Sequence, residues 1–420
     1  MVPNTDGEES DEMTRGSRRW LAAAMVGALA VTGCARIPLD GPSSATTRPS
    51  TAGTTVGERS PRPTAPAASP TGSTTAQHRA ATLVFSGDLL WHDSVWLSAA
   101  DDHRRTGKGD TYDFDPMFAA MKPVISSADL AVCHEEVPFA KLGQAPVGYP
   151  TFRAPRQIAA WIPTMGWDAC TTASNHSIDQ GFSGLKDTYD LLRQHGVQPV
   201  GTFPTAAARA TPVILTTRQG VRIGLVSGTY ATNGIPLPKG REWSLSMWDA
   251  DNLLAQAHRA RQAGADFVVV SMHGGDEYQT APNQAQRELV RRLTASSDVD
   301  LVVGEHVHVV QPITRVNHTW VVYGMGNLVA QHLTDVPRGY EGITVRFTVA
   351  ERSGGGFEVS RAEYIPTLVT HYSPGHPVRI LPVVPSLASG TGDRARLQVA
   401  LQRTRQAVHS MGGDEGLSEG

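Results

Sequence analysis

Five short apolar segments of this chain each end within a few residues of a side chain that can bind a metal ion. The segments span residues 82–85, 130–133, 168–173, 267–272 and 301–303, and their branched apolar composition predicts β-strands. The side chains that follow them are Asp88, Glu136, Asn175, His176, His273, His306 and His308. Open α/β sheets bind ligands at the carboxyl ends of their strands. We therefore expect an α/β fold in which these side chains share one metal or catalytic cluster.

Segments with helical periodicity lie between and after the strands. They span residues 114–128, 156–165, 184–195, 249–262, 284–295 and 394–409. Strands that alternate with helices are typical of α/β domains whose helices cover the faces of the sheet.

The last of the five strands stops at Gly304 and is followed by His306 and His308. In an extended segment, alternate side chains point to the same face, so the two imidazoles can converge on one point. A neutral imidazole nitrogen is a common ligand of transition metals. The alternative is that both are polar loop histidines bonded only to their neighbours.

The predicted cluster combines carboxylates, an amide oxygen and imidazoles, without an obvious thiolate. This donor set favours Mn, Fe or Zn at a catalytic site over a closed structural zinc site. The groups suffice for one or two divalent ions, with a carboxylate such as Asp88 placed to bridge two of them. Two ions would activate a water and stabilise the charge on a displaced phosphate or ester oxygen.

The N-terminal region resembles an export signal. Arg15, Arg18 and Arg19 precede an apolar run, residues 20–31, that is too short to span a bilayer comfortably. The run leads to Cys34 in a sequence that resembles a bacterial lipobox, in which cleavage leaves a lipidated cysteine. We expect a lipoprotein signal peptide at residues 1–33; an ordinary secretory signal with a chance cysteine is the alternative.

Residues 34–77 are expected to form a lipidated, disordered tether, because more than half of residues 41–77 are Ser, Thr or Pro. A folded domain would follow at 78–370, and then a C-terminal extension at 371–420 with one helix and a polar tail. This layout predicts an extracytoplasmic protein anchored to the cell membrane through Cys34. The formal net charge of −3 gives no electrostatic reason to expect a nucleic-acid partner.

Cys133 and Cys170 both lie in apolar, strand-like runs. Buried free thiols are the first expectation. A disulfide is the alternative in an oxidising compartment, if the two strands are neighbours.

The ordered polar motifs resemble those of the CapA family. The motifs are Gly87-Asp88, Glu136-Val137-Pro138, Ser174-Asn175-His176, His273-Gly274-Gly275, Gly304-x-His306-x-His308 and Gly326-Asn327. This family is associated with synthesis of the poly-γ-glutamate capsule and is similar to calcineurin-like metallophosphatases. The resemblance implies an αββα sandwich, in which two mixed β-sheets are flanked by helices.

The resemblance also implies roles for individual residues. Its metal ligands would be Asp88, Glu136, Asn175, His273, His306 and His308. His176 matches a histidine that in the phosphatases lies near the leaving group. Asp179 would assist His176 in catalysis or would instead be a helix N-cap. Glu277, Tyr278 and Asn327 match positions for which substrate binding is expected, with a turn residue as the alternative for Asn327.

The chain departs from the phosphatase pattern at its first motif. Leu90 stands where the phosphatases carry a histidine, and His92 is the candidate replacement. His134 stands where the family often has asparagine. The cluster could therefore hold two ions, one ion or a weakly bound one. His92, His103 and His332 are expected to be solvated or capping residues.

Two functions from different classes follow. The first is a metal-dependent hydrolase or transferase that acts on an anionic polymer, a phosphoester or a glutamyl linkage in capsule or envelope synthesis. The second is a non-catalytic component of a membrane complex for polymer synthesis or export.

Overall fold

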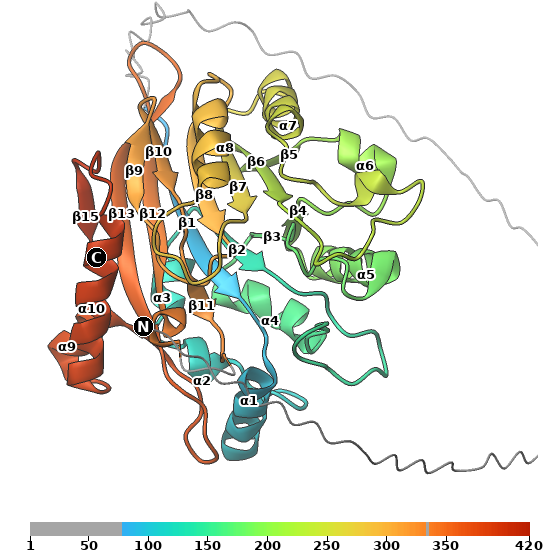
Figure 1. Cartoon of the computed structure of the whole chain (residues 1–420), viewed down its shortest axis with the longest axis vertical. Helices are drawn as coiled ribbons and strands as arrows, with labels where there is room; N and C mark the ends of the chain where they lie inside the picture. Colours follow the sequence, from blue (N-terminus) through green and yellow to red (C-terminus); the bar gives the residue numbers. More distant parts are fainter. Residues whose placement is uncertain (1–77, 333–335) are drawn as a thin grey trace, which may run out of the picture. The chain divides into compact units, whose positions relative to one another are not determined.

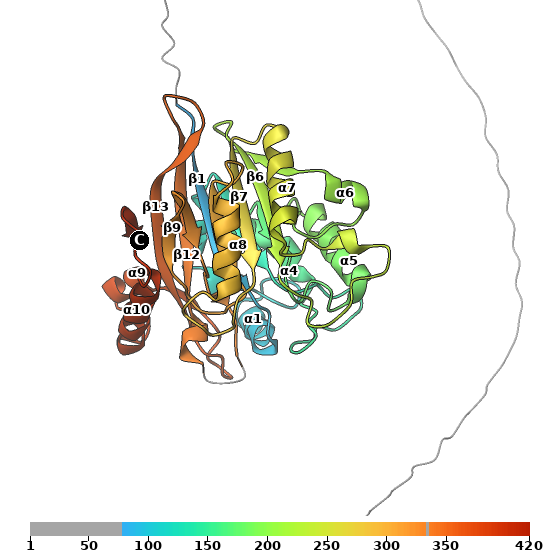
Figure 2. The ribbon, with the colours of Figure 1, turned by 45° about the horizontal axis from the view of Figure 1, so that its top comes forward.

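The computed structural model describes residues 78–332 and 336–420, which fold around two β-sheets (Figures 1 and 2). The predicted signal peptide (1–33), the lipidated Cys34 and the tether (34–77) lie outside the described residues, so these remain predictions. No helix in the described part of the chain is long and apolar enough to cross a membrane.

The first sheet is mixed. Its main path in the described residues runs β14 (Ile380–Pro382), β13 (Phe357–Val369), β12 (Glu341–Glu351), β1 (Ala80–Leu89), β2 (Leu130–Glu135), β3 (Ala169–Thr171) and β4 (Gln198–Val200). Strands β1 to β4 are parallel, whereas β12, β13 and β14 pair antiparallel. Two short strands, β11 (Asn327–Val329) and β15 (Leu417–Glu419), pair with β1 and β13.

The second sheet is also mixed, with the order β5 (Val213–Thr216), β6 (Arg222–Thr229), β7 (Phe267–His273), β8 (Leu301–Glu305), β10 (Thr319–Val322) and β9 (Ile313–Val316). The central strands β6, β7, β8 and β10 are parallel, and the edge strands β5 and β9 are antiparallel. Central parallel strands are buried on both faces, which explains the continuous apolar run of β7.

Side-chain alternation along the strands divides the core into layers. Phe85 and Val303 point into the apolar layer that the two sheets share, whereas Val84 and Val302 point to outer layers. Helices α1 (Asp93–Thr106) and α4 (Gln157–Met165) contribute to the outer layer of the first sheet. Helices α7 (Ala250–Gln262) and α8 (Gln284–Thr294) cover the second sheet (Figure 2). The predicted α/β arrangement of two mixed sheets flanked by helices is confirmed.

Several helices differ from the prediction. The helix expected at 114–128 is two short helices, α2 (Asp115–Phe118) and α3 (Lys122–Ser126). Pro123 explains the break, because proline cannot continue a helix but fits its first turn. Helix α1 was not predicted; its N-cap His92 makes no side-chain capping bond that would mark the start. The remaining helices are α5 (Gly181–Gln194), α6 (Ala206–Ala210), α9 (Val383–Ser389), α10 (Arg394–Val408) and the 3₁₀ turns η1 (Glu242–Ser244) and η2 (Pro337–Tyr340).

The C-terminal segment differs from the predicted extension with one helix and a polar tail. It contains two helices, α9 and α10, and two strands, β14 and β15, that join the first sheet. Figure 1 shows α9 and α10 beside β13. Leu397 and Ala400 of α10 belong to the outer core layer, so this segment is part of the same folded unit.

Cys133 and Cys170 form a disulfide, which corrects the expectation of free thiols. They lie directly opposite each other in the parallel pair of β2 and β3. The sequence did not show that these two strands are neighbours.

Candidate metal centre

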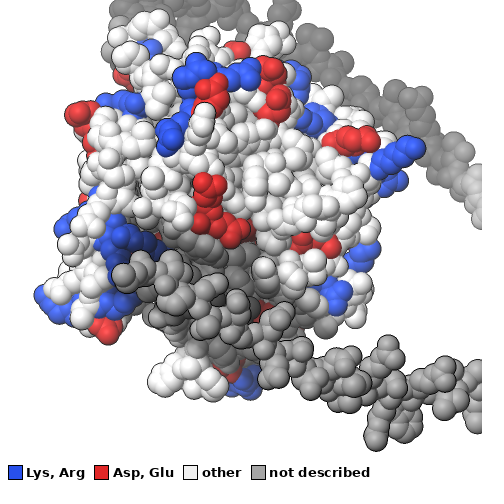
Figure 3. Space-filling model, in the orientation of Figure 1, with Lys and Arg blue, Asp and Glu red and all other residues white. Residues whose placement is uncertain are grey.

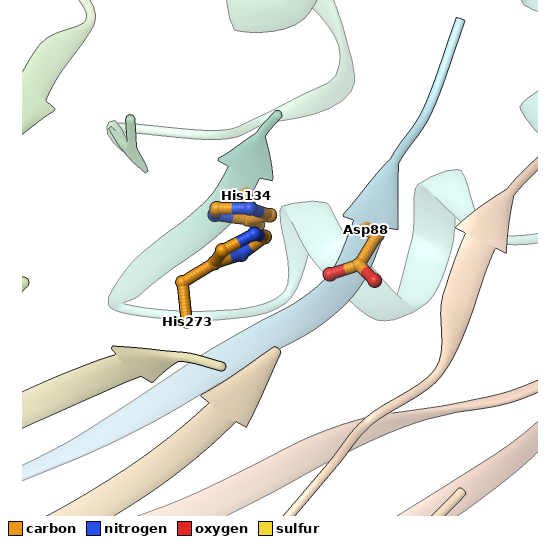
Figure 4. A group of neighbouring side chains, drawn as sticks. All are labelled: Asp88, His134 and His273. Atoms are coloured by element: carbon orange, nitrogen blue, oxygen red, sulfur yellow. The ribbon is translucent and has the colours of Figure 1, made fainter. Parts of the chain in front are cut away.

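The structure brings the six predicted metal ligands together at the carboxyl ends of β1, β2, β3, β7 and β8. All six side chains are buried; they are Asp88, Glu136, Asn175, His273, His306 and His308. The cluster contains two sets of three potential ligand atoms, and within each set the atoms lie within 4.8 Å of one another. One set is Asp88, His134 and His273 (Figure 4), and the other is Glu136, His306 and His308.

Glycines let the strand ends approach closely enough to form this cluster. A Cβ on Gly87 would lie 2.0 Å from the carbonyl oxygen of Gly326, and one on Gly304 would lie 1.9 Å from that of Tyr323. Asp88 N–H donates to the same Gly326 carbonyl, at 3.0 Å. Gly87 and Gly304, in the motifs around Asp88 and His306, are therefore required by close backbone contact, and Gly326 before Asn327 is favoured by its φ of 68°.

His306 and His308 do not converge in the way expected of an extended strand. Both have left-handed backbone conformations, with φ of 90° and 57°. A non-glycine residue in this region costs about 1–3 kcal/mol and persists where its surroundings fix it. Here His306 N–H donates to Asp88 Oδ2 at 3.3 Å, and the His308 ring is bonded to two acceptors.

Glu136 lies at the middle of the cluster. Its Oε1 is 4.0 Å from His273 Nε2 and 3.9 Å from His308 Nε2, and both carboxylate oxygens are buried without a hydrogen-bond partner. Burial raises the pKa of Glu136 to about 7, against the opposing influence of His308. A carboxylate in this position needs a proton or a cation.

The Nδ1–H of His308 is shared between Asp88 Oδ2, at 3.1 Å, and Asn327 Oδ1, at 3.0 Å. Burial opposes the charged form of His308, but Glu136 and Asp88 raise its pKa to about 9. Burial likewise works against ionised Asp88, yet the His308 bond lowers the pKa of Asp88 overall. Asn327 is fully buried, and its amide donates to Gly339 O at 2.8 Å. Its contact with the His308 ring can position that ring, and its role in substrate binding stays a prediction.

His176 and Asp179 form the predicted pair beside the cluster. His176 Nδ1 lies 2.8 Å from Asp179 Oδ2, which also accepts from Phe152 N–H at 2.7 Å. Asp179 is not a helix cap, because α5 begins at Gly181 with Gln180 as its N-cap. Since Asp179 reaches the site only through the ring of His176, it is a positioning residue. Asn233, which the sequence did not single out, bridges Asn175 at 3.0 Å and His176 at 3.3 Å.

A second buried pair was also missed. His134 Nδ1 lies 3.0 Å from Glu305 Oε2, and both side chains are almost completely inaccessible. Hydroxyls of Thr171 and Ser271 donate to the two oxygens of Glu305, at 3.0 and 2.8 Å. Burial disfavours charged His134, but Glu305 and the cluster carboxylates raise its pKa to about 9. Only the spatial meeting of β2 with β8 shows this pair.

Two partly exposed tyrosines lie against the cluster histidines. The ring of Tyr230 is 4.6 Å from that of His306, and the ring of Tyr278 is 5.9 Å from that of His308. Their exposed fractions are 44% and 37%. Burial and the charge of the neighbouring Glu277 raise the pKa of Tyr278 to about 12. Substrate binding by Tyr278 and the exposed Glu277 stays a prediction. Tyr230 was not singled out by the sequence.

The histidines expected to be solvated behave differently from one another. His103 is on the surface and its ring bonds to Lys108 O at 2.7 Å, as expected. His92 is buried instead, where its Nδ1 accepts from Gln331 N–H at 3.2 Å. His332 is half-buried, with its Nε2 3.0 Å from the amide of Asn327. Neither His92 nor the apolar, buried Leu90 belongs to the two potential ligand sets.

The donor set fits a divalent metal. Besides both oxygens of Glu136, three buried ring nitrogens have no hydrogen-bond partner: His134 Nε2, His273 Nδ1 and His306 Nδ1. Among residues 78–332 and 336–420, no lysine or arginine pairs with Asp88 or Glu136. Buried polar atoms are normally satisfied, so this concentration of orphan donors and acceptors marks a site that a cation can complete.

The face of the molecule drawn in Figure 3 carries charges of both signs. Figure 3 shows lysines and arginines interspersed with acidic side chains, and acidic side chains gather near the middle of the view.

Curated relatives carry names from capsule synthesis. The chain is 28% identical to "PGA biosynthesis protein CapA" of Bacillus subtilis over 47% of this chain and 51% of that protein. It is 30% identical to "Capsule biosynthesis protein CapA" of Bacillus anthracis over 40% of this chain and 41% of that protein. A Mycobacterium tuberculosis relative named "Probable polyglutamine synthesis accessory protein" is 29% identical over 46% and 48% of the two chains. The matches thus span about half the length of these relatives.

Solved structures with a related arrangement include a putative 5′-nucleotidase from Staphylococcus aureus, with a TM-score of 0.44 and 18% identity over 76% of this chain and 57% of that one. A calcineurin-like phosphoesterase from Bacillus subtilis gives a TM-score of 0.43 and 15% identity over 79% and 98% of the two chains.

The sequence profile described as "Bacterial capsule synthesis protein PGA_cap" matches residues 82–332. This range holds more than half of the chain, and it includes all six side chains of the cluster that were predicted as ligands. The chain belongs to this family of bacterial capsule synthesis proteins.

Proposed function

We propose that this protein is a metal-dependent hydrolase or transferase of the cell envelope that acts in the synthesis of poly-γ-glutamate or a related capsule polymer. Membership of the capsule synthesis family and the names of the relatives support the process. The sequence of the N-terminal region supports attachment to the membrane through lipidated Cys34. The substrate would be a phosphoester or an amide or glutamyl linkage in an anionic polymer.

One observation carries the enzymatic part of the proposal. Glu136 is buried with both oxygens unpartnered, between His273 and His308 and near the buried Asp88. An unpaired buried carboxylate is costly unless a proton or cation neutralises it. The surrounding donors match Mn, Fe or Zn, in one or two copies.

Divalent ions held by these residues would supply Lewis acidity, which activates water at neutral pH and stabilises negative charge on a displaced oxygen. His176 would donate a proton to the leaving group. Its Nδ1 is engaged by Asp179, so Nε2 is the nitrogen that remains to donate. Tyr230 and Tyr278 would contact the substrate, because they are the partly exposed rings against the cluster.

A second function has specific support. The Mycobacterium tuberculosis relative is named an accessory protein of polymer synthesis, and the chain matches only about half of each curated relative. On this alternative, the protein is a non-catalytic partner of a membrane synthase or export complex. Its cluster would then bind an ion for structure or for ligand capture.

Turnover experiments separate these functions. The purified chain is stripped with a chelator, reloaded with Mn²⁺, Fe²⁺ or Zn²⁺, and assayed on phosphomonoester, phosphodiester and γ-glutamyl anilide substrates. We expect turnover on at least one class that depends on added metal and that Glu136→Gln abolishes. His103→Gln is the matched control, because this half-buried surface histidine lies outside the cluster. A folded, metal-loaded chain without turnover on any class would favour the accessory function.

A further inference from the structure

His134 combines three features that distinguish it from a histidine that only fills the core. Its side chain is completely buried, its Nδ1 lies 3.0 Å from Glu305 Oε2, and its Nε2 has no hydrogen-bond partner. It also contributes a nitrogen to the set of potential ligand atoms formed with Asp88 and His273. Figure 4 shows its ring stacked beside that of His273, with the Asp88 carboxylate facing both rings. The two ring centroids are 4.7 Å apart.

Glu305 is placed to fix the ring of His134. It comes from β8 in the second sheet, whereas His134 comes from β2 in the first, so the pair crosses between the sheets. The hydroxyls of Thr171 and Ser271 hold the two oxygens of Glu305. The Thr171 hydroxyl also lies 2.8 Å from His134 Nδ1. An Nδ1–H directed at this hydroxyl and at the carboxylate leaves the lone pair of Nε2 free to bind a cation. Carboxylate–histidine pairs of this kind orient metal ligands and raise their basicity.

We propose that His134 is a ligand of the metal cluster through Nε2 and that Glu305 is its positioning residue. The phosphatase pattern places a histidine two residues after the first aspartate, but Leu90 at that position is buried among apolar side chains. His92 is no substitute, because its Nδ1 already accepts from Gln331 N–H. His134 supplies an imidazole on the side of Asp88, from a different strand. The inference rests on the proposed function only in requiring that the cluster binds a cation.

The rival explanation is a purely structural His134–Glu305 ion pair that ties the two sheets together. Two substitutions separate the roles of the two ring nitrogens. His134→Asn places an amide about where Nδ1 lies, so it can keep the bond to Glu305 but loses the group that faces Asp88. His134→Gln reaches about as far as Nε2, so it can offer an oxygen to the cation but loses the bond to Glu305.

The experiment measures metal per chain by elemental mass spectrometry and metal affinity by Co²⁺ titration of the chelator-stripped full chain, followed by visible absorption. We expect Glu305→Gln to weaken Co²⁺ binding by about 10–100-fold, the effect typical of a lost outer carboxylate. His134→Asn should weaken it further or remove one ion, and His134→Gln should retain more metal than His134→Asn. His92→Asn, a buried histidine outside the cluster, should bind as the unmodified chain does.

Circular dichroism checks that each variant is folded. If a His134 variant does not fold, the metal affinity of Glu305→Gln decides the test. The inference is overturned if His134→Asn keeps the metal content and Co²⁺ affinity of the unmodified chain, or if His134→Gln alone loses metal. Loss of metal in His306→Ala/His308→Ala in that same experiment would leave the proposed function standing. Absence of metal from the unmodified chain would overturn both.

Discussion

Two regions of this molecule contain buried carboxylates, and they differ in the side chains that neutralise these groups. Near the C-terminal segment, Asp102 is fully buried and receives both guanidinium nitrogens of Arg379, each at 2.8 Å. Glu341 in β12 is buried and is paired with Arg396 and Arg403 of α10. At the strand ends, the cationic side chains that the described residues offer to Glu136 are histidines about 4 Å away.

The difference shows in which region the buried charged groups are satisfied by other side chains of the protein. Arginine pairs satisfy the carboxylates that hold the C-terminal segment to the sheet, so these groups need nothing further. The strand-end cluster leaves two carboxylate oxygens and three imidazole nitrogens unsatisfied. The first region is satisfied by its own side chains, whereas the second has unsatisfied groups that a cation could complete.

The sharpest test of this difference removes the charge of Glu136. Glu136→Gln should cut metal-dependent turnover by about a thousandfold or more, because the metal supplies several kcal/mol of charge stabilisation. The same substitution should leave the metal-free protein as stable as before or more stable, since it removes an unpaired buried charge. Turnover assays and urea unfolding after chelation measure the two effects. Marked destabilisation of the metal-free protein would contradict the assignment.

The converse substitution removes an arginine from the ion pairs near the C-terminal segment. Arg379→Ala removes the bidentate partner of buried Asp102 and leaves Arg105 as its remaining cationic partner. The substitution should therefore lower the free energy of unfolding by about 2 kcal/mol, as for a lost hydrogen bond to a charged group. Metal content per folded chain should not change. A loss of metal as large as that of His306→Ala/His308→Ala would show that the two regions are not independent.

His176 tests which residues belong to the metal cluster. It adjoins the predicted ligands, but its ring is paired with Asp179. His176→Ala should lower kcat by about a hundredfold or more, as for a lost general acid, while metal content stays the same. Asp179→Asn should have a smaller effect in the same direction, since the imidazole remains. If His176→Ala loses metal instead, the residue is a ligand and its assignment to proton transfer is wrong.

The stability that the strand-end cluster contributes should depend on pH. In the metal-free protein, the pKa values of His134 and His308 are raised to about 9. The stability that these groups contribute is therefore complete below about pH 6.5 and is lost as the pH rises towards 9. Bound metal must displace their protons, so stabilisation by added metal should grow over that same range. Thermal unfolding with and without metal measures both trends; a metal-free protein that gains stability between pH 6.5 and 9 would contradict them.

Local sequence patterns predicted the α/β class and the ligand candidates, whereas the two-sheet sandwich was implied by the resemblance to the CapA family. Apolar runs such as residues 267–272 mark strands, and parallel strands place their carboxyl ends at one edge. Local patterns could not reveal the His134–Glu305 pair or the bridge made by Asn233, because these contacts join segments that meet only in the folded chain. The same limit applies to the disulfide between β2 and β3.

The most direct test of the central claim is the metal content of the purified protein, measured by elemental mass spectrometry beside His306→Ala/His308→Ala. We predict about one or two transition-metal ions per chain, the number that the donors at the strand ends can hold, and their loss in the double variant. Absence of bound metal at near-physiological supply, with both proteins equally folded, would contradict the claim that a cation completes the strand-end cluster.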